Sequence, residues 1–455
     1  MSGRPLLIII LAAGKGTRMK SDRPKVLHEV AGRSLLGHVI ASAGAAGADK
    51  IAVVVGPGMD DVRAEAIRWF PGAEVHVQPG QMGTGDAVLA ARETIARASG
   101  DVIVLFGDTP LITPETIAAA SNGLAAAGIA VVGFQASDPT GYGRLLQDAS
   151  GQVIAIREHK DASEAERQVK LCNTGVMGFR SETMLEILGR IGNNNAKGEY
   201  YLTDAVEIGR SMGVAAAAVT GREDEMLGIN DRSQLAEAER MFQVRARTCA
   251  MAEGATLVAP ETVHFSFDTR LGRDVVIEPY VVFGPGVTIE DGVTVRAFSH
   301  LTGTDRKVKA GTVVREGAEI GPYARLRPGA EIGRGAHIGN FVEVKNVAVG
   351  AGAKANHLSY LGDGSVGAGA NIGAGTIFCN YDGFRKHKTE IGAGAFIGSN
   401  SSLVAPVKIG EGAYIGSGSV VTKDVSENAL ALERSKQAEI PGWAAKFRAL
   451  MQKRS

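Results

Sequence analysis

The first half of the chain alternates short apolar runs with stretches of helical pattern. Runs rich in Val, Ile and Leu predict strands that are buried on both faces, as in a parallel sheet between helices. The expected strands span residues 6–13, 50–56, 73–78, 101–108, 128–135, 153–159 and 170–179, and the expected helices span residues 34–46, 60–69, 84–98, 114–127, 181–191 and 203–212. This alternation predicts an open α/β fold, in which ligands bind at the carboxyl ends of the strands.

The second half has a different period. Residues 231–252 are charged and Ala-rich and predict a connecting helix that begins at Asn230 or Asp231. Beyond it, an aliphatic or Phe residue recurs every six positions, often followed directly by Gly: Leu271, Ile277, Phe283, Ile289, Val295 and Leu301; Val314, Ile320, Leu326, Ile332, Ile338 and Val344; Ile391, Ile397, Leu403, Ile409, Ile415 and Val421. This repeat predicts a parallel β-helix with three short strands per coil.

Two slips in the six-residue period predict loops. The interval from Leu301 to Val314 is one residue longer than two repeats, and the interval from Ile372 to Ile391 is one residue longer than three. The second slip contains TIFCNYDGFRKHKT (376–389), whose polar and basic residues break the pattern, so we expect an ordered projecting loop there. The chain is thus expected to comprise an α/β domain (1–230), a linker helix (231–252) and a β-helix domain with a C-terminal tail (253–455).

Composition narrows the functional classes. Glycine supplies 60 of 455 residues, and the dense C-terminal set marks the corners of the predicted coils. The balance of 49 Lys and Arg against 49 Asp and Glu gives no net charge, which argues against a nucleic-acid or membrane-surface partner. The three cysteines form no CxxC pair, so we expect neither a disulfide framework nor a zinc site, but a reducing cytoplasm.

A glycine-rich, basic string, LAAGKGTRMKSDRPK (11–25), follows the first predicted strand. Gly14 and Gly16 would let a phosphate approach the backbone, and Lys15, Arg18 and Lys25 supply local cations. The string is neither a P-loop nor GxGxxG, and its glycines alone also fit an ordinary turn. Because cleavage would destroy this pattern, the apolar run before it is interpreted as a buried strand rather than a signal sequence. No apolar segment is long enough to cross a membrane.

Asp108 ends the apolar run DVIVLFGD, which places a carboxylate at the tip of a strand. There it could hold Mg²⁺, which prefers oxygen ligands, or simply cap the next helix. His357, in ANHLSYLGD (355–363), could act as a general base near neutral pH or be a polar residue at a coil corner.

The string 11–25 resembles the signature of sugar-nucleotide pyrophosphorylases. Together with the hexapeptide half, nearly the whole chain resembles the bacterial family of bifunctional N-acetylglucosamine-1-phosphate uridylyltransferases and glucosamine-1-phosphate acetyltransferases. The resemblance implies a Rossmann-like nucleotidyltransferase domain joined by a helix to a left-handed parallel β-helix.

For the first domain, the resemblance implies a site for UTP and the UDP-sugar. Gln78, Gly83 and Thr84 match positions that read the uracil, and Gly143, Glu158 and Asn173 match positions that contact the sugar. Asp108 and Asn230 match the ligands of Mg²⁺. EYYLTD (199–204) also matches but has no role that the sequence assigns. The implied UTP and UDP-sugar site comprises Leu11, Ala12, Gly14, Arg18, Lys25, Gln78, Gly83, Thr84, Gly143, Glu158, Asn173 and Asn230.

For the β-helix, the resemblance implies an acetyltransferase site with His357 as the general base. The implied acceptor site comprises Arg327, Lys345, Tyr360, Asn371 and Lys386, and the implied acetyl-CoA site comprises Ala374, Asn380, Tyr381, Ser399, Ser417 and Arg434. The basic tail from Lys446, which includes Lys453 and Arg454, is either a solvated terminus or a contact for coenzyme A phosphates.

The implied function is the two-step synthesis of UDP-N-acetylglucosamine for peptidoglycan and lipopolysaccharide precursors, by a cytoplasmic homotrimer whose other partners are small molecules. One alternative is a monofunctional pyrophosphorylase whose β-helix only oligomerises or regulates, and the other is a non-catalytic scaffold. A scaffold need not keep Lys25, Asp108 and Asn230, and a regulatory β-helix need not keep His357 with its matched cations, yet all are present.

Overall fold

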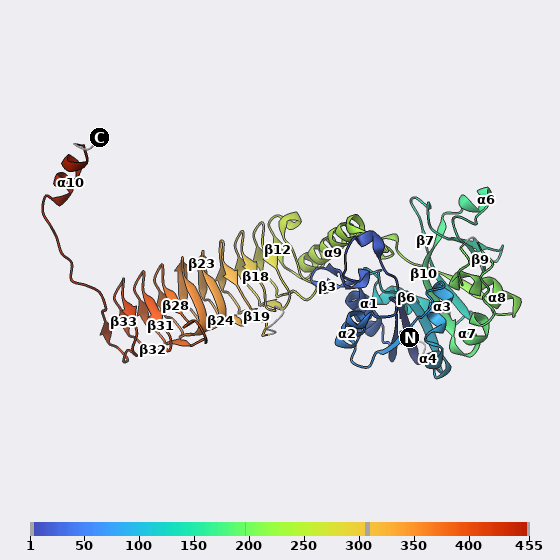
Figure 1. Cartoon of the computed structure of the whole chain (residues 1–455), viewed down its shortest axis with the longest axis horizontal. Helices are drawn as coiled ribbons and strands as arrows, with labels where there is room; N and C mark the ends of the chain where they lie inside the picture. Colours follow the sequence, from blue (N-terminus) through green and yellow to red (C-terminus); the bar gives the residue numbers. More distant parts are fainter. Residues whose placement is uncertain (1–3, 196, 305–309, 453–455) are drawn as a thin grey trace. The chain divides into compact units, whose positions relative to one another are not determined.

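The computed structural model describes residues 4–195, 197–304 and 310–452 (Figure 1). The chain divides into two compact units, Met1–Arg245 and Ala246–Ser455, which we describe separately. The division falls within helix α9 (Arg232–Ala252). The side chain of Asp231 accepts a hydrogen bond from the Gln234 backbone at 2.9 Å and so caps the first turn of this helix.

The first unit is built on a mixed sheet. Its strands lie in the order β11 (Ala216–Thr220), β7 (Ile129–Gln135), β10 (Leu171–Arg180), β6 (Asp101–Phe106), β1 (Leu6–Leu11), β4 (Lys50–Val55) and β5 (Glu74–Val77), with β8 (Arg144–Gln147) and β9 (Val153–Arg157) extending from β10. The expected α/β fold is confirmed, but the expectation of a purely parallel sheet was wrong, because β10 runs antiparallel to both β6 and β7. The pattern also missed β8 and β11, which are short.

Helices cover both faces of this sheet. Alternate residues of β1 point to opposite sides: Ile8 and Ile10 belong to one core cluster, and Ile9 belongs to the other. The first cluster contains residues of α1 (Leu35–Ala45), α2 (Asp60–Trp69) and α5 (Pro114–Gly123); the second contains residues of α3 (Thr84–Leu89), α4 (Arg92–Ala96), α7 (Ser181–Leu188) and α8 (Ala205–Ser211). The single helix expected over 84–98 is therefore two short helices.

Short elements fill the connections. They are η1 (Thr17–Met19), η2 (Lys25–Leu27), the hairpin of β2 (Glu29–Val30) and β3 (Arg33–Ser34), α6 (Glu164–Arg167), η3 (Leu202–Asp204) and η4 (Glu223–Glu225). In the described part of the chain, no helix is both long and apolar enough to cross a membrane.

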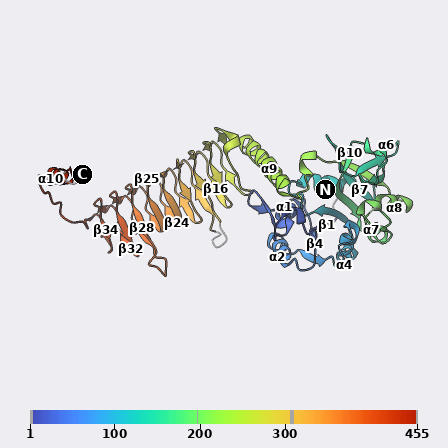
Figure 2. The same ribbon diagram turned by 45° about the horizontal axis from the view of Figure 1, so that its top comes forward.

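The second unit is the predicted left-handed parallel β-helix, whose coils stack in a row in Figure 2. Most strands pair in parallel with the third strand onward, as β14 with β17 and β15 with β18, which gives three strands per coil. One face comprises β12 (Thr256–Leu257), β14 (Val276–Ile277), β17 (Thr294–Val295), β20 (Glu319–Ile320), β23 (His337–Asn340), β25 (Lys354–His357), β27 (Asn371–Ile372), β30 (Phe396–Ile397), β33 (Tyr414–Ile415) and β35 (Leu430–Ala431).

The other two faces share a second hydrogen-bonded network. Its strands are β13 (Arg270–Leu271), β15 (Val282–Phe283), β16 (Val287–Ile289), β18 (His300–Leu301), β19 (Thr312–Val314), β21 (Arg325–Leu326), β22 (Ala330–Ile332), β24 (Glu343–Val349), β26 (Tyr360–Val366), β28 (Ile377–Cys379), β29 (Thr389–Ile391), β31 (Ser402–Val404), β32 (Val407–Ile409) and β34 (Val420–Val421). The turn η5 (Pro260–Thr262) lies near the start of the unit, and α10 (Trp443–Gln452) near its end.

The six-residue set forms the core of the β-helix. Every member is buried except Leu271, which lies in one of the first coils, is half-buried and packs against the core. The loop of the second slip is ordered as predicted: the Asp382 carboxylate accepts hydrogen bonds from the Phe384 and Arg385 backbone, each at 2.7 Å, and His387 Nε2 lies 2.7 Å from it. The first slip falls partly on 305–309, and the tail residues Lys453 and Arg454 also lie outside the described residues.

Candidate active sites

The first candidate site is a cleft at the carboxyl ends of β1 and β6. It consists of adjoining cavities of about 600 and 590 Å³ that share Thr84, Asp108 and Glu158 in their walls. Every residue of the predicted nucleotide and metal set lines one cavity or both: Leu11, Ala12, Gly14, Lys25, Gln78 and Gly83 the first; Arg18, Gly143, Asn173 and Asn230 the second; Thr84, Asp108 and Glu158 both. The structure therefore brings this set together, although its chemical roles stay predictions.

Two oxygen ligands converge on one cation in this cleft. The Lys25 ammonium lies 2.5 Å from Asp108 Oδ2 and 3.2 Å from Asn230 Oδ1. The Lys25 and Asp108 side chains are mostly buried, at 11% and 20% exposed. A carboxylate and an amide oxygen already placed around a positive charge fit Mg²⁺, which needs few protein ligands and takes the rest from water and phosphates. In the described part of the chain, no three His, Cys, Asp or Glu side chains gather as metal ligands.

The glycine-rich string positions Lys25. Gly16 has a φ of +64°, and a Cβ there would lie 2.5 Å from Lys25 Cβ. Only glycine both adopts this left-handed conformation without strain and leaves room for Lys25. Gly16 is therefore needed to bring the Lys25 ammonium to Asp108.

The segment around Gly83 is held by the EYYLTD motif. The Gly85 backbone donates to Tyr200 O at 2.8 Å, the Tyr200 backbone donates to Met82 O at 2.8 Å, and the Leu202 backbone donates to Thr84 Oγ1 at 3.0 Å. The buried Gln78 amide donates to Gly83 O at 3.0 Å. The motif that the sequence left without a role thus fixes the wall of the cleft that is predicted to read the base.

The opposite wall carries the predicted sugar contacts. The Asn173 backbone donates to Gly143 O at 2.8 Å, which ties the two segments together. Burial raises the pKa of the Glu158 carboxyl group above its usual value, against the opposing effect of Lys197. Sequence reasoning missed Gln81, whose amide donates to Ala13 O at 2.6 Å, and the lining residue Lys197. It gave no individual role to the lining residues Phe106, Lys160, Asp161, Tyr201 and Thr203, although they lie in motifs that it singled out. Polar residues such as Gln81 and Lys197 are also common in ordinary loops, so their types alone give no signal.

The second candidate site follows a single column of the β-helix. Asn340 pairs with His357 in register, and the pairing of Ala355 with Ile372, Ile372 with Ile397 and Ile397 with Ile415 continues the column. Two residues beyond these partners lie His357, Ala374, Ser399 and Ser417, one in each of four successive coils. The predicted base and three predicted acetyl-CoA residues are therefore stacked along one edge.

His357 has a fixed partner that the sequence did not single out. Its Nδ1 lies 2.6 Å from Asn340 Oδ1. The amide oxygen can only accept, so Nδ1 carries the hydrogen in the neutral ring and Nε2 is the basic nitrogen. An asparagine that ends a short strand gives no sequence signal of this role.

A polar cluster on the neighbouring faces gathers four more predicted residues. Asn380 Nδ2 lies 3.4 Å from the Tyr360 hydroxyl, and the Lys386 ammonium lies 3.4 Å from Asn380 Oδ1 and 4.9 Å from the centre of the Tyr381 ring. Asp363, which the sequence did not single out, accepts from Asn380 at 2.6 Å.

The other predicted β-helix residues lie around these groups. Lys345 pairs with Gly362, two residues from Tyr360, and Asn371 begins β27. The Arg434 guanidinium donates to Ser417 O at 2.9 Å, which joins two predicted acetyl-CoA residues. Arg327 forms a 2.7 Å ion pair with Glu343.

The two folds with their sites define a transferase of two catalytic units, a nucleotidyltransferase followed by a hexapeptide-repeat transferase. The MobA-like NTP transferase domain matches residues 8–169, and the bacterial transferase hexapeptide (six repeats) matches residues 268–303, 311–346 and 388–423.

Curated relatives match the whole length. The chain is 59% identical over 450 residues to the Bifunctional protein GlmU of Azorhizobium caulinodans, covering 99% of this chain and 98% of the relative. It is 56% identical over 454 residues to that of Xanthobacter autotrophicus (100% and 99% covered) and 58% identical over 449 residues to that of a Bradyrhizobium species (98% of each covered). The chain belongs to the family of Bifunctional protein GlmU.

This membership establishes an enzyme with two activities. It transfers an acetyl group from acetyl-CoA to glucosamine 1-phosphate, and a uridylyl group from UTP to N-acetylglucosamine 1-phosphate, which yields UDP-N-acetylglucosamine and pyrophosphate. The alternatives of a scaffold and of a β-helix without its own activity are thereby set aside.

Proposed function

We propose that uridylyl transfer takes place in the cleft of the first unit, with Asp108 and Asn230 holding Mg²⁺. The convergence of their oxygens on the Lys25 ammonium carries this assignment, because it marks the point in the cleft that is built for positive charge. When bound, the metal stabilises the negative charge that develops on the transferring phosphoryl group.

The chain's own residues then supply position and charge. An oxygen of the sugar 1-phosphate attacks the α-phosphorus of UTP, a new P–O bond forms, and the bond to pyrophosphate breaks. Lys25 and Arg18 balance charge on the phosphates, while the walls at Gly83 and Gly143 hold the base and the sugar in line. No side chain needs to become covalently attached, because orientation and electrostatics lower the barrier.

We propose that acetyl transfer takes place at His357. Its Nε2 accepts a proton from the glucosamine amine as the nitrogen attacks the thioester carbon; the C–S bond breaks, and the sulfur of coenzyme A leaves and takes up a proton. The column from His357 to Ser417 supports this assignment, since it places the predicted acetyl-CoA residues in line with the base. Tyr360, Lys345 and Lys386 would hold the sugar phosphate. In the proposed order, this acetylation precedes uridylylation.

A homotrimer is part of the proposal. Four aromatic rings stack along one corner of the β-helix, with neighbouring ring centres 5.0, 5.0 and 5.3 Å apart: Tyr280, Phe298, Tyr323 and Phe341. Each of these side chains is about half exposed. Leu358, which is also exposed, continues the column next to His357. Exposed apolar surface of this extent favours a covering partner. Sedimentation should give the mass of three chains, and Phe298→Glu with Tyr323→Glu should lower it; a monomeric wild type would contradict this part of the proposal.

We also propose a cytoplasmic location with small molecules as the other partners. Free thiols at Cys172, Cys249 and Cys379 agree with a reducing compartment, and the net charge of zero does not favour a polyanionic partner.

One experiment tests both site assignments. The enzyme is incubated with glucosamine 1-phosphate, acetyl-CoA, UTP and Mg²⁺, each omitted in turn, while free thiol and pyrophosphate are followed separately. Omission of Mg²⁺ should stop pyrophosphate release alone, and omission of acetyl-CoA should stop both signals. His357→Ala should abolish thiol release, and Asp108→Ala should abolish pyrophosphate release from supplied N-acetylglucosamine 1-phosphate. With N-acetylglucosamine 1-phosphate supplied directly, a loss of pyrophosphate release in His357→Ala would overturn the assignment, and so would a loss of thiol release in Asp108→Ala.

A further inference from the structure

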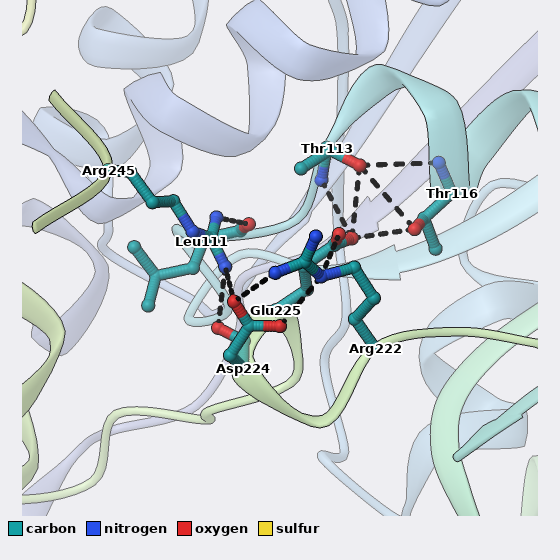
Figure 3. Close-up of polar contacts among 7 residues, drawn as sticks. All are labelled: Leu111, Thr113, Thr116, Arg222, Asp224, Glu225 and Arg245. Atoms are coloured by element: carbon teal, nitrogen blue, oxygen red, sulfur yellow. Dashed lines mark hydrogen bonds and ion pairs between the residues drawn. The ribbon is translucent and has the colours of Figure 1, made fainter. Parts of the chain in front are cut away.

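A buried carboxylate joins the two chain segments that carry Asp108 and Asn230 (Figure 3). Glu225, in η4, is only 3% exposed. Its Oε2 accepts hydrogen bonds from Thr116 Oγ1 at 2.6 Å, from Thr113 Oγ1 at 3.0 Å and from the Thr113 backbone at 3.4 Å. A carboxylate removed from water is costly unless such donors surround it, and here Thr113 and Thr116 supply them.

The bonded segments lead directly to the proposed metal ligands. Thr113 lies five residues after Asp108 at the start of α5, and Glu225 lies five residues before Asn230. Between them, the Ile229 backbone donates to Asp108 O at 2.9 Å. Glu225 therefore links the two chain segments that carry Asp108 and Asn230. Thr113, which bonds to Glu225, lies five positions from Asp108, and Glu225 itself lies five positions from Asn230.

A second link connects the same two segments. The Arg245 guanidinium donates to Leu111 O at 2.8 Å and to Asp224 O at 2.7 Å, and it lies 3.0 Å from Asp224 Oδ2. It thus joins the same two loops from α9 (Figure 3). The Arg222 side chain is mostly exposed, with its Nε 3.7 Å from Glu225 Oε1, so it contributes little to holding the buried carboxylate.

We infer that Glu225 is a positioning residue for uridylyl transfer, which fixes the distance between Asp108 and Asn230 through Thr113 and Thr116. The inference rests on the proposed assignment of the metal to these two residues. Groups that orient metal ligands without touching the metal commonly change metal affinity by about 10-fold to 100-fold when they are removed.

The test compares Glu225→Ala, Glu225→Gln and Thr116→Val with a matched control, Glu223→Gln. Glu223 belongs to the same turn, but its carboxylate accepts from Ser137 Oγ at 2.9 Å rather than from Thr113 or Thr116. Mn²⁺ binding with UTP present is measured by electron paramagnetic resonance, and the Mg²⁺ concentration for half-maximal uridylyl transfer is measured in parallel. Thermal unfolding checks that each variant is folded.

We expect both metal constants to rise about tenfold in Glu225→Ala, by less in Thr116→Val and Glu225→Gln, and not at all in Glu223→Gln. A purely structural role would lower the unfolding temperature and leave the metal constants of the folded fraction unchanged, which would overturn the inference. Thr116→Val decides the case if Glu225→Ala does not fold.

Asp108→Ala separates the inference about Glu225 from the assignment of the metal to Asp108 and Asn230. If it weakens Mn²⁺ binding and the Glu225 variants do not, only the inference fails; if it too binds Mn²⁺ normally, the metal assignment fails.

Discussion

His357 and Asn340 lie side by side in adjacent coils, with Nδ1 of the imidazole 2.6 Å from the amide oxygen. The parallel register of β23 and β25 sets this contact. It fixes the ring through the backbone of the β-helix rather than through a flexible loop, and it leaves Nε2 as the basic nitrogen.

Changing Asn340 should alter the pH dependence of acetyl transfer. Asn340→Asp would place a carboxylate beside Nδ1 and stabilise the imidazolium, so the acid limb of the pH–rate profile should move to higher pH by about one unit. Asn340→Ala should lower kcat without moving uridylyl transfer. An unchanged profile in Asn340→Asp would show that the contact does not control the base.

Lys25→Met tests the charge of the Lys25 side chain, because it removes the ammonium and keeps a side chain of similar length in the cleft. Removing the ammonium from between Asp108 and Asn230 leaves their oxygens without the cation they contact here. We expect uridylyl transfer to fall by at least about 100-fold, because a preorganised charge on a transferring phosphate is worth several kcal/mol, with acetyl transfer unchanged. Arg23→Met, whose guanidinium pairs with Glu29 on the surface, is the control and should retain both activities.

Gly83→Ala should impair the use of UTP. Gly83 has a φ of +114°, and a Cβ would lie 2.7 Å from Tyr200 O, so the wall of the cleft must shift. Steady-state kinetics should show a raised KM for UTP. Gly213→Ala is the matched control, since Gly213 also has a positive φ, +80°, but nothing lies within 4 Å of the added Cβ. Equal effects of the two changes on KM would exclude crowding at Tyr200 as the cause.

The first unit should lose stability in mild acid through His38. Burial lowers the pKa of this imidazole to about 4. Between pH 6.5 and 4 the unfolded chain binds a proton that the folded chain does not, so stability falls as the pH falls. Linkage gives a loss of about 2 kcal/mol between pH 7 and pH 5.

His38→Gln should remove this contribution while it keeps an amide that can donate to Val30 O, the partner of His38 Nε2 at 2.9 Å. Urea unfolding at pH 5 and pH 7 is followed by the fluorescence of Trp69 in a Trp443→Phe background. A wild type with equal stability at both pH values would contradict the prediction.

The repeat made the β-helix predictable in detail, because one inward residue in six is dictated by the core. Strand direction in the first unit was not predictable in the same way. The run 170–179 is as apolar as its neighbours, and nothing in it distinguishes the antiparallel β10 from a parallel strand. Direction depends on the connections, which the pattern does not encode.

In the candidate sites too, some residues could be recognised from the sequence and others only from the fold. Lys25, Asp108 and His357 could be singled out as candidates, since their types and motifs carry chemistry. Glu225 and Asn340 could not, because each acts through a contact with a residue distant in the sequence. Before the fold is known, such polar residues look like ordinary turn and cap residues.

The stacking of the coils fixes the spacing along the column that runs from His357 through Ala374 and Ser399 to Ser417. Neighbouring strands are about 4.8 Å apart, so the three steps of this column cover roughly 14 Å. A loop such as the one at 380–388 can lengthen a coil without altering that spacing, because each coil is registered only to its neighbours. The distance between two side chains of this column can therefore change only by whole coils.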